Sequence, residues 1–141
     1  MFVIIMGCGR VGARLAGMME AAGHDVTIMD TNPSAFARLG SEFRGNTMIG
    51  NGIDQEVLRR AGVERADAFV AATQGDNRNI MASQVAQHVF KVKTVVTRIY
   101  DPLRADTFAT LGLNAISPTI LGANRFYQEL TGQPADAVAG V

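Results

Sequence analysis

The sequence predicts an α/β fold with a six-stranded, doubly wound parallel sheet in the strand order 3-2-1-4-5-6. Three observations lead to this prediction. Short apolar runs alternate with helical patterns six times along 141 residues, a glycine-rich turn joins the first run to the first helix, and an acidic residue ends the second run. Strict alternation places helices on both faces of a parallel sheet, with a crevice at the carboxyl ends of strands 1 and 4.

Six short runs rich in apolar residues are the predicted strands. The first run is continuously apolar, as expected for a central parallel strand that is covered on both faces. The strands are expected at residues 2–6, 26–29, 47–49, 66–72, 94–99 and 115–116.

Helices are predicted between these strands from apolar residues at three- and four-residue spacing and from signals at the helix ends. In the first helix, residues 10–22, the stripe expected to pack on the sheet consists of Val11, Leu15, Met18, Met19 and Ala22, and Gly23 caps the helix. Asn32-Pro33 opens the second helix, whose expected apolar face is Phe36, Leu39 and Phe43, with Gly40 inside it. Further helices are expected at residues 53–61, 79–90, 102–111 and 119–131.

The turn Gly7-Cys8-Gly9-Arg10-Val11-Gly12 follows the first strand and opens the first helix. Gly7 permits the tight turn, Gly9 lets a pyrophosphate approach the backbone, and Gly12 allows close packing of helix on strand. Free N–H groups at the helix start attract phosphate, and the Arg10 guanidinium can reach one, although a solvated surface arginine is the alternative. At Cys8 only the backbone is required. The whole turn is assigned to a predicted nucleotide site of a Rossmann-type fold.

Asp30 ends the second strand, about 20 residues after the glycine turn, where a carboxylate accepts hydrogen bonds from ribose hydroxyls. The same charge repels a 2′-phosphate, and no Arg or Lys follows within the next few residues. Asp30 and its neighbour Thr31 therefore predict NAD(H), ATP, ADP or AMP as the ligand and disfavour NADP. A simple cap of the strand end is the alternative role for Asp30.

Two further loops are expected to reach this crevice. In Gly50-Asn51-Gly52 the amide of Asn51 can pair with an adenine edge, although a plain Asn-Gly turn explains the same residues equally well. Thr73 follows the fourth strand and is a candidate contact to ribose or phosphate. Asp76 or Asn77 is expected to cap the next helix.

Arg98 lies in the fifth predicted strand, where an arginine needs a partner for its charge. Three partners fit the sequence: a ligand phosphate, a carboxylate of a second subunit, or an internal salt bridge.

The composition argues against several classes of function. The 13 basic and 13 acidic residues balance, which gives no broad attraction to nucleic acid or to anionic lipid. One cysteine excludes an internal disulfide and fits a reducing cytoplasm, and we expect neither a signal peptide nor a membrane span. No catalytic set and no metal-ligand cluster is apparent. We therefore expect a binding or sensing domain rather than an enzyme; the alternative is the cofactor-binding half of an NAD-dependent oxidoreductase.

The motifs as a set resemble a known family. They are the glycine turn, Asp30, Gly50-Asn51-Gly52-Ile53-Asp54 with Val57-Leu58 and Ala61-Gly62-Val63, residues 66–73, Asp76-Asn77-Arg78-Asn79 and Thr97-Arg98-Ile99. Over roughly residues 1–130 they resemble the N-terminal lobe of an RCK domain, also called a KTN or TrkA-N domain. The resemblance implies a cytoplasmic, nucleotide-binding regulatory subunit of a Trk or Ktr potassium uptake system, or a gating ring of a potassium channel. It implies a homodimer that assembles into a ring and meets the membrane only through its transporter partner.

The resemblance also assigns residues. It gives Gly7, Gly9, Arg10 and Gly12 to the phosphates, Asp30 to the ribose, Asn51 to the adenosine end, where many members have Asp, and Thr73 and Arg98 to the site lining. It implies a nucleotide-binding lobe (1–118) and a crossover helix for dimerisation (119–131). The remaining tail (132–141) is expected to be flexible because it is terminal, rich in small residues and broken by Pro134. The expected dimer face is Ile120, Leu121, Asn124, Tyr127 and Leu130, with Phe126 beside it. The alternative is a helix packed on its own core. Full regulatory subunits carry a further C-terminal lobe, so we expect either a fragment or a single-lobe protein.

Overall fold

The computed structural model describes residues 1–138. Its strands are β1 (Phe2–Met6), β2 (Asp25–Asp30), β3 (Asn46–Ile49), β4 (Ala68–Ala71), β5 (Thr94–Arg98) and β6 (Asn114–Ile116). They form one parallel sheet in the order β3-β2-β1-β4-β5-β6. The predicted fold class and strand order are confirmed, and the strand ends lie within two residues of the expected positions.

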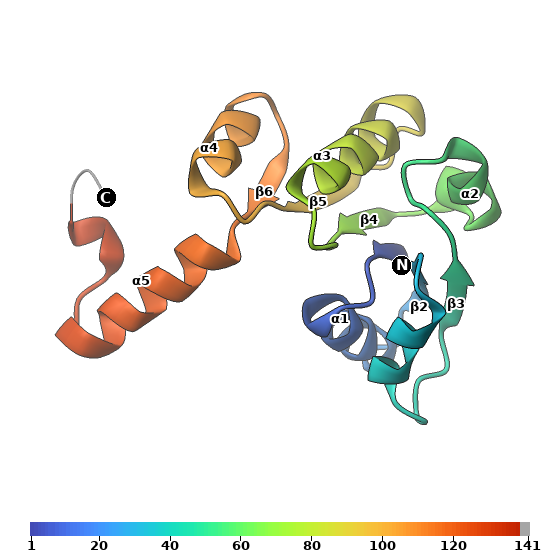
Figure 1. The fold of residues 1–141 in the computed structure, drawn as a ribbon, viewed down its shortest axis with the longest axis horizontal. Helices are drawn as coiled ribbons and strands as arrows, with labels where there is room; N and C mark the ends of the chain where they lie inside the picture. The colour runs from blue at the N-terminus through green and yellow to red at the C-terminus, as the bar shows by residue number, and fades with distance from the viewer. Residues whose placement is uncertain (139–141) are drawn as a thin grey trace.

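The α-helices are α1 (Arg10–Ala21), α2 (Gln55–Arg60), α3 (Asp76–Gln84), α4 (Pro102–Thr110) and α5 (Pro118–Thr131). Shorter helical segments are η1 (Pro33–Leu39), η2 (Val63–Arg65), η3 (Val85–Val89), a π-helical turn that continues α3, and η4 (Ala135–Ala137). Figure 1 shows α1 on one face of the sheet and α2 and α3 on the other.

The sheet separates two hydrophobic cores, and β1 contributes to both; Ile80, Ile99, Ala105 and Leu113 form a third, smaller cluster. Phe2, Ile4 and Met6 belong to the core that contains α2 and α3 residues, whereas Val3 and Ile5 belong to the core that contains α1 and η1 residues. All five are buried. Because alternate residues of a strand face opposite sides of a sheet, a strand covered on both sides must be apolar throughout.

The face of α1 that packs on the sheet differs from the predicted stripe. Val11 and Met18 are 46% and 60% exposed, whereas Ala13 and Ala16 are buried. A Cβ atom on Gly12 would lie 1.8 Å from the carbonyl oxygen of Gly7. The helix therefore lies close to the turn and strand, and its fully buried residues are small. Leu15 and Met19 of the predicted stripe are partly buried and pack against the same core.

Two other helical predictions need correction. The second helix is the 3₁₀ segment η1, and Gly40 follows it with a φ of +77° rather than lying inside it. The helix expected at 79–90 begins at Asp76, and its last part is the π-helical turn η3. Within the predicted tail, η4 forms a short turn, and residues 139–141 lie outside the described part of the chain.

Helix α5 extends away from the sheet and its covering helices (Figure 1). None of its residues is buried, and Leu121, Phe126 and Leu130 are 59%, 73% and 85% exposed. The alternative of a helix packed on its own core is therefore wrong for this chain. Within residues 1–138, no helix combines the length and hydrophobicity that crossing a membrane requires.

Candidate functional site

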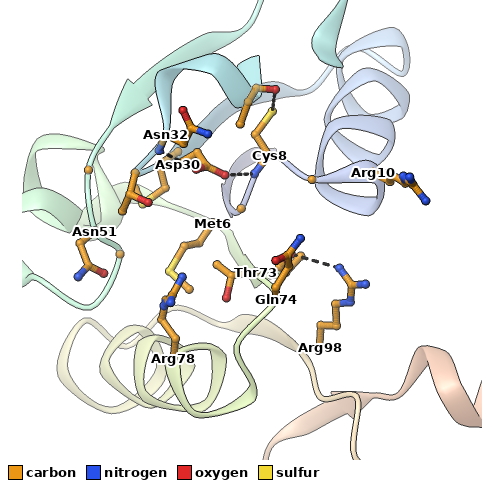
Figure 2. A pocket seen from close by; sticks show the side chains of 18 of the residues that line it. Met6, Cys8, Arg10, Asp30, Asn32, Asn51, Thr73, Gln74, Arg78 and Arg98 are labelled. Carbon is orange, nitrogen blue, oxygen red and sulfur yellow. Dashed lines mark hydrogen bonds between the residues drawn. The ribbon is translucent and has the colours of Figure 1, made fainter. Parts of the chain in front are cut away.

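A cleft of about 630 Å³ lies at the carboxyl ends of the central strands. Its size is in the range of about 300–1,000 Å³ that is typical of small-molecule sites. The residues that line it come from the ends of β1, β2 and β4, from the loop after β3, and from η1, α3 and the end of β5 (Figure 2).

Most of the predicted site residues line this cleft. They are Gly7, Cys8, Gly9, Arg10, Asp30, Thr31, Asn51, Gly52, Thr73 and Arg98. Val11 and Gly12 do not line it: Val11 is exposed on α1, and Gly12 lies beneath the turn against Gly7. In Figure 2 Arg10 lies at the edge of the view and points away from Asp30.

The three glycines of the turn differ in what requires them. Gly7 has a φ of +108°, and a Cβ there would lie 2.8 Å from the backbone of Ala72. Gly12 is held against the Gly7 carbonyl, as described above. A Cβ on Gly9 would meet no protein atom within 4 Å. Packing therefore requires Gly7 and Gly12, whereas protein packing does not require Gly9, which faces the cleft.

The carboxylate of Asp30 is held by two backbone donors. The N–H of Cys8 donates to Oδ2 at 2.8 Å, and the N–H of Asn32 donates to Oδ1 at 2.8 Å. Since each carboxylate oxygen has two acceptor positions, both oxygens keep capacity for a further donor such as a ribose hydroxyl. Asp30 therefore does more than cap the strand end, because it joins β2 to the glycine turn.

Cys8 contributes its backbone to the cleft and its side chain to the core. The thiol is fully buried, and its Sγ donates to the carbonyl of Ala35 at 3.4 Å. Burial and the charge of Asp30 raise the pKa of the thiol, and the opposing charge of Arg38 lowers it. The net shift is upward, which keeps the thiol protonated and unreactive at neutral pH.

The loop after β3 forms the turn that was one of the two alternatives for Asn51, and its pairing with an adenine edge stays a prediction. Its side-chain Oδ1 accepts from the N–H of Ile53 at 3.3 Å, so it forms an Asx turn, and the residue also lines the cleft. A Cβ on Gly52 would lie 2.2 Å from the sulfur of Met6, so any larger residue there would have to displace the Met6 side chain.

Asn79 organises the far side of the cleft, and sequence reasoning missed it. It is fully buried, and its amide accepts from the N–H and hydroxyl of Thr73. The same amide donates to the carbonyls of Thr73 and Arg98 at 3.0 and 2.9 Å. It therefore fixes the ends of β4 and β5 relative to each other, and the only signal for it was its place in the family-like Asp76–Asn79 segment.

The predicted capping role of Asp76 or Asn77 is wrong. The N-cap residue of α3 is Gly75, which has no side chain. Asp76 instead accepts from the backbone N–H groups of Tyr100 and Asp101 at 2.8 and 3.2 Å. It thus holds the chain that leaves β5.

Arg98 has no ion pair with any carboxylate of residues 1–138, so the internal salt bridge is excluded for the described chain. Its guanidinium lies over the ring of Tyr100, with Cζ 4.1 Å from the ring centroid. One terminal nitrogen donates to the carbonyl of Ala72 at 3.4 Å. Its Nε is buried without a hydrogen-bond partner among these residues.

The charges around the cleft are unbalanced although the whole chain is neutral. Four arginines and one aspartate line it: Arg10, Arg38, Arg78, Arg98 and Asp30. Sequence reasoning missed Arg38 and Arg78 because η1 and α3 bring them in from outside the strand-end loops. Such a set attracts an anionic ligand. No group of three or more potential metal-ligating side chains occurs in the described range.

Comparison with known proteins identifies one family and a similar relative. Residues 3–118 match the family described as the TrkA-N domain. The chain is 44% identical over 136 residues to the Trk system potassium uptake protein TrkA of Streptomyces coelicolor, covering 96% of this chain and 61% of that protein. It therefore spans less than two thirds of the length of this relative.

Two similar solved structures share the fold. One is the Kef C-terminal domain of Shewanella denitrificans in an AMP-bound form, with a TM-score of 0.79 and 22% identity over 97% of this chain and 86% of that one. The other is the GsuK channel bound to NAD, with a TM-score of 0.78 and 22% identity over 92% of this chain and 23% of that one.

Proposed function

This chain belongs to the TrkA-N domain family, and on that basis we propose that it is the nucleotide-binding part of a regulatory subunit for potassium uptake. The observation that carries the proposal is the family match over residues 3–118 together with the arginine-rich cleft at the strand ends. The relative from Streptomyces coelicolor, named a potassium uptake protein, supports the transport role.

The proposed ligand is NAD(H) or an adenine nucleotide. Its phosphates lie on the glycine turn, where the N-cap residue Gly9 has no side chain to compete for the first N–H groups of α1. Asp30 accepts from the ribose hydroxyls, and Asn51 faces the adenosine end. The Kef and GsuK structures, bound to AMP and NAD, support this choice of ligand class.

Selection against NADP is proposed from Asp30, whose charge repels a 2′-phosphate. The positive charge of Arg38 on η1 opposes this repulsion, because Arg38 lines the same cleft. Both Asp30 and Arg38 are close enough to Cys8 to shift the pKa of its thiol. Asp30 is held by two backbone donors, whereas Arg38 is exposed. We therefore assign the net selection to the fixed carboxylate.

The proposed output is a change in subunit arrangement. The exposed apolar face of α5 pairs with a second copy of the chain, and such dimers assemble into a ring. A potassium transporter in the membrane binds the ring on its cytoplasmic side and responds to changes in its conformation. Arg10, exposed at the cleft edge, contacts phosphate and responds to the nucleotide state. A ligand shifts such an equilibrium only by its difference in affinity for the two arrangements, and about 1.4 kcal/mol shifts it tenfold.

The test is calorimetric titration of the purified chain with AMP, ADP, ATP, NAD+, NADH and NADP+. We expect saturable binding of adenine nucleotides or NAD(H) and much weaker binding of NADP+. Tight binding of NADH alone would favour the oxidoreductase alternative, and no binding at all would refute the proposal. Restoration of growth at low potassium in an uptake-deficient bacterium, with loss of that rescue in the Gly9→Ala variant of the full-length protein, tests the transport role.

A further inference from the structure

The two ends of the cleft differ in their chemistry. The strand order β2-β1-β4-β5 puts Asp30, at the end of β2, and Arg98, at the end of β5, on opposite sides of the glycine turn. Figure 2 shows the same separation, with Asn51 at one side of the view and Arg98 at the other. A nucleotide whose adenosine lies at the Asp30 end extends past the turn toward Arg98.

The Arg98 guanidinium is held in place before any ligand arrives. The guanidinium lies over the Tyr100 ring. The backbone of Arg98 is fixed as well, because the Asn79 side-chain amide donates to the Arg98 carbonyl at 2.9 Å. Of its five N–H donors, one makes a long bond of 3.4 Å to Ala72, and Nε is buried without a partner in the described chain. An arginine with fixed orientation and unused donors is suited to a phosphate.

The group that reaches Arg98 depends on the ligand. In AMP the single phosphate ends at the glycine turn. ADP, ATP and NAD+ all carry a second phosphate beyond it. In ADP and ATP the phosphate chain ends in free, highly charged oxygens, whereas in NAD+ the second phosphate is esterified, carries a single charge and is followed by the nicotinamide ribose and a cationic ring, which a guanidinium repels.

Resting on the proposed nucleotide function, we propose that Arg98, positioned by Tyr100 and Asn79, forms a terminal-phosphate subsite. This subsite makes the cleft select adenosine di- and triphosphates over AMP and NAD+. It gives Arg98 a specificity role distinct from that of the glycine turn, which serves all these ligands alike.

The test compares the wild-type chain with Arg98→Gln and Arg98→Lys by calorimetry with AMP, ADP, ATP and NAD+ in a buffer without divalent cations. Arg60→Gln is the matched control, because Arg60 is an exposed arginine outside the cleft lining. We expect Arg98→Gln to weaken ADP and ATP by about tenfold or more, since hydrogen bonds to charged groups are strong. AMP should change less than about twofold, NAD+ should weaken less than ADP and ATP do, and Arg98→Lys should recover part of the loss because it keeps the charge.

Three outcomes separate the explanations. An equal loss for all four ligands would show that Arg98 only supports the fold of the cleft, and unchanged ADP binding would show that it does not touch the ligand; either result overturns the inference alone. If the wild-type chain binds none of the four, the proposed function fails as well. Thermal unfolding of each ligand-free variant checks that the comparison concerns folded protein.

Discussion

The Asp30 carboxylate accepts a 2.8 Å hydrogen bond from the backbone N–H of Cys8, which ties the end of β2 to the glycine turn after β1. The second oxygen accepts from Asn32 in the loop that follows. One acidic residue thus shapes the turn expected to bind phosphate while it keeps acceptor capacity for a ribose. Asp30 is therefore expected to contribute both to fold stability and to the proposed ligand selection.

Replacement of Asp30 by Asn is expected to affect both properties. The Asn amide can accept from one backbone donor but presents its own N–H groups to the other, so the free energy of unfolding should fall by about 1–3 kcal/mol. With the negative charge gone and Arg38 still in the cleft, NADP+ should bind almost as well as NAD+. Denaturant unfolding and paired titrations measure the two effects. Continued exclusion of NADP+ would show that Asp30 does not set this selection.

Alanine at the glycines of the turn should separate packing from ligand binding. Gly9→Ala adds a methyl group where no protein atom lies within 4 Å, so thermal stability should stay close to that of the wild type while nucleotide binding weakens by about tenfold or more. Gly12→Ala places the methyl group against the Gly7 carbonyl and should unfold at a clearly lower temperature. If Gly9→Ala binds nucleotide normally, the ligand does not approach the backbone at this turn.

The Cys8 thiol should make the fold sensitive to alkaline pH. Because its pKa is raised in the folded chain, mainly by burial, the folded state holds the thiol proton more tightly than the unfolded state does. This contribution to stability is fully present below the ordinary thiol pKa of 9.0 and is lost as the pH rises through the higher folded value.

Denaturant unfolding from neutral to alkaline pH checks this expectation, with Cys8→Ala as the control because every other titrating group is unchanged. The wild type should lose stability more steeply than the variant. Parallel curves for the two proteins would contradict the predicted pKa shift.

The exposed face of α5 should control association rather than folding. Phe126→Glu and Leu130→Glu change side chains that are 73% and 85% exposed, so the domain should unfold in dilute solution at nearly the wild-type temperature. A dimer in light scattering should become a monomer, because burial of two charges in an apolar interface is unfavourable. Gln128→Glu, a charge change at an exposed α5 position outside the proposed dimer face, is the control. A mass unaffected by the paired change would place the subunit contact elsewhere.

The fold could be predicted from the sequence because its determinants are local. The apolar run of β1, Asp30 at the end of β2 and the cap signals at Asn32 and Asp101 are readable in short windows, and both caps occur in the structure. Alternation of strands and helices then limits the topology to the order that is observed.

The face of α1 was predicted only in part, for a physical reason. A hydrophobic pattern places the largest apolar residues inward, but close approach of the helix to Gly7 leaves the fully buried positions to Gly12, Ala13 and Ala16, whereas Leu15 and Met19 are only partly buried. The glycine motif itself signals this close packing, and it should take precedence over side-chain hydrophobicity in such helices.

Much of the site depends on contacts between distant segments, which a single sequence does not reveal. Asn79 joins Thr73 to Arg98, and Asp76 holds Tyr100 and Asp101 across the gap between two strand ends. Rules based on neighbouring residues assign Asp76 a capping role, because they consider only the helix that contains it and not the distant Tyr100 and Asp101. The stacking of Arg98 on Tyr100 likewise depends on side-chain directions at the end of β5.

An NMR titration of the ¹⁵N-labelled chain with ADP would locate the nucleotide site. We expect saturable shifts of backbone amides around the cleft, above all Gly9, Arg10, Thr31, Asn51 and Thr73, with little change at Gly112 and Asn114 near the opposite end of the sheet. Saturable shifts confined to that opposite end, or no shifts at all, would contradict the assignment of this cleft as the nucleotide site.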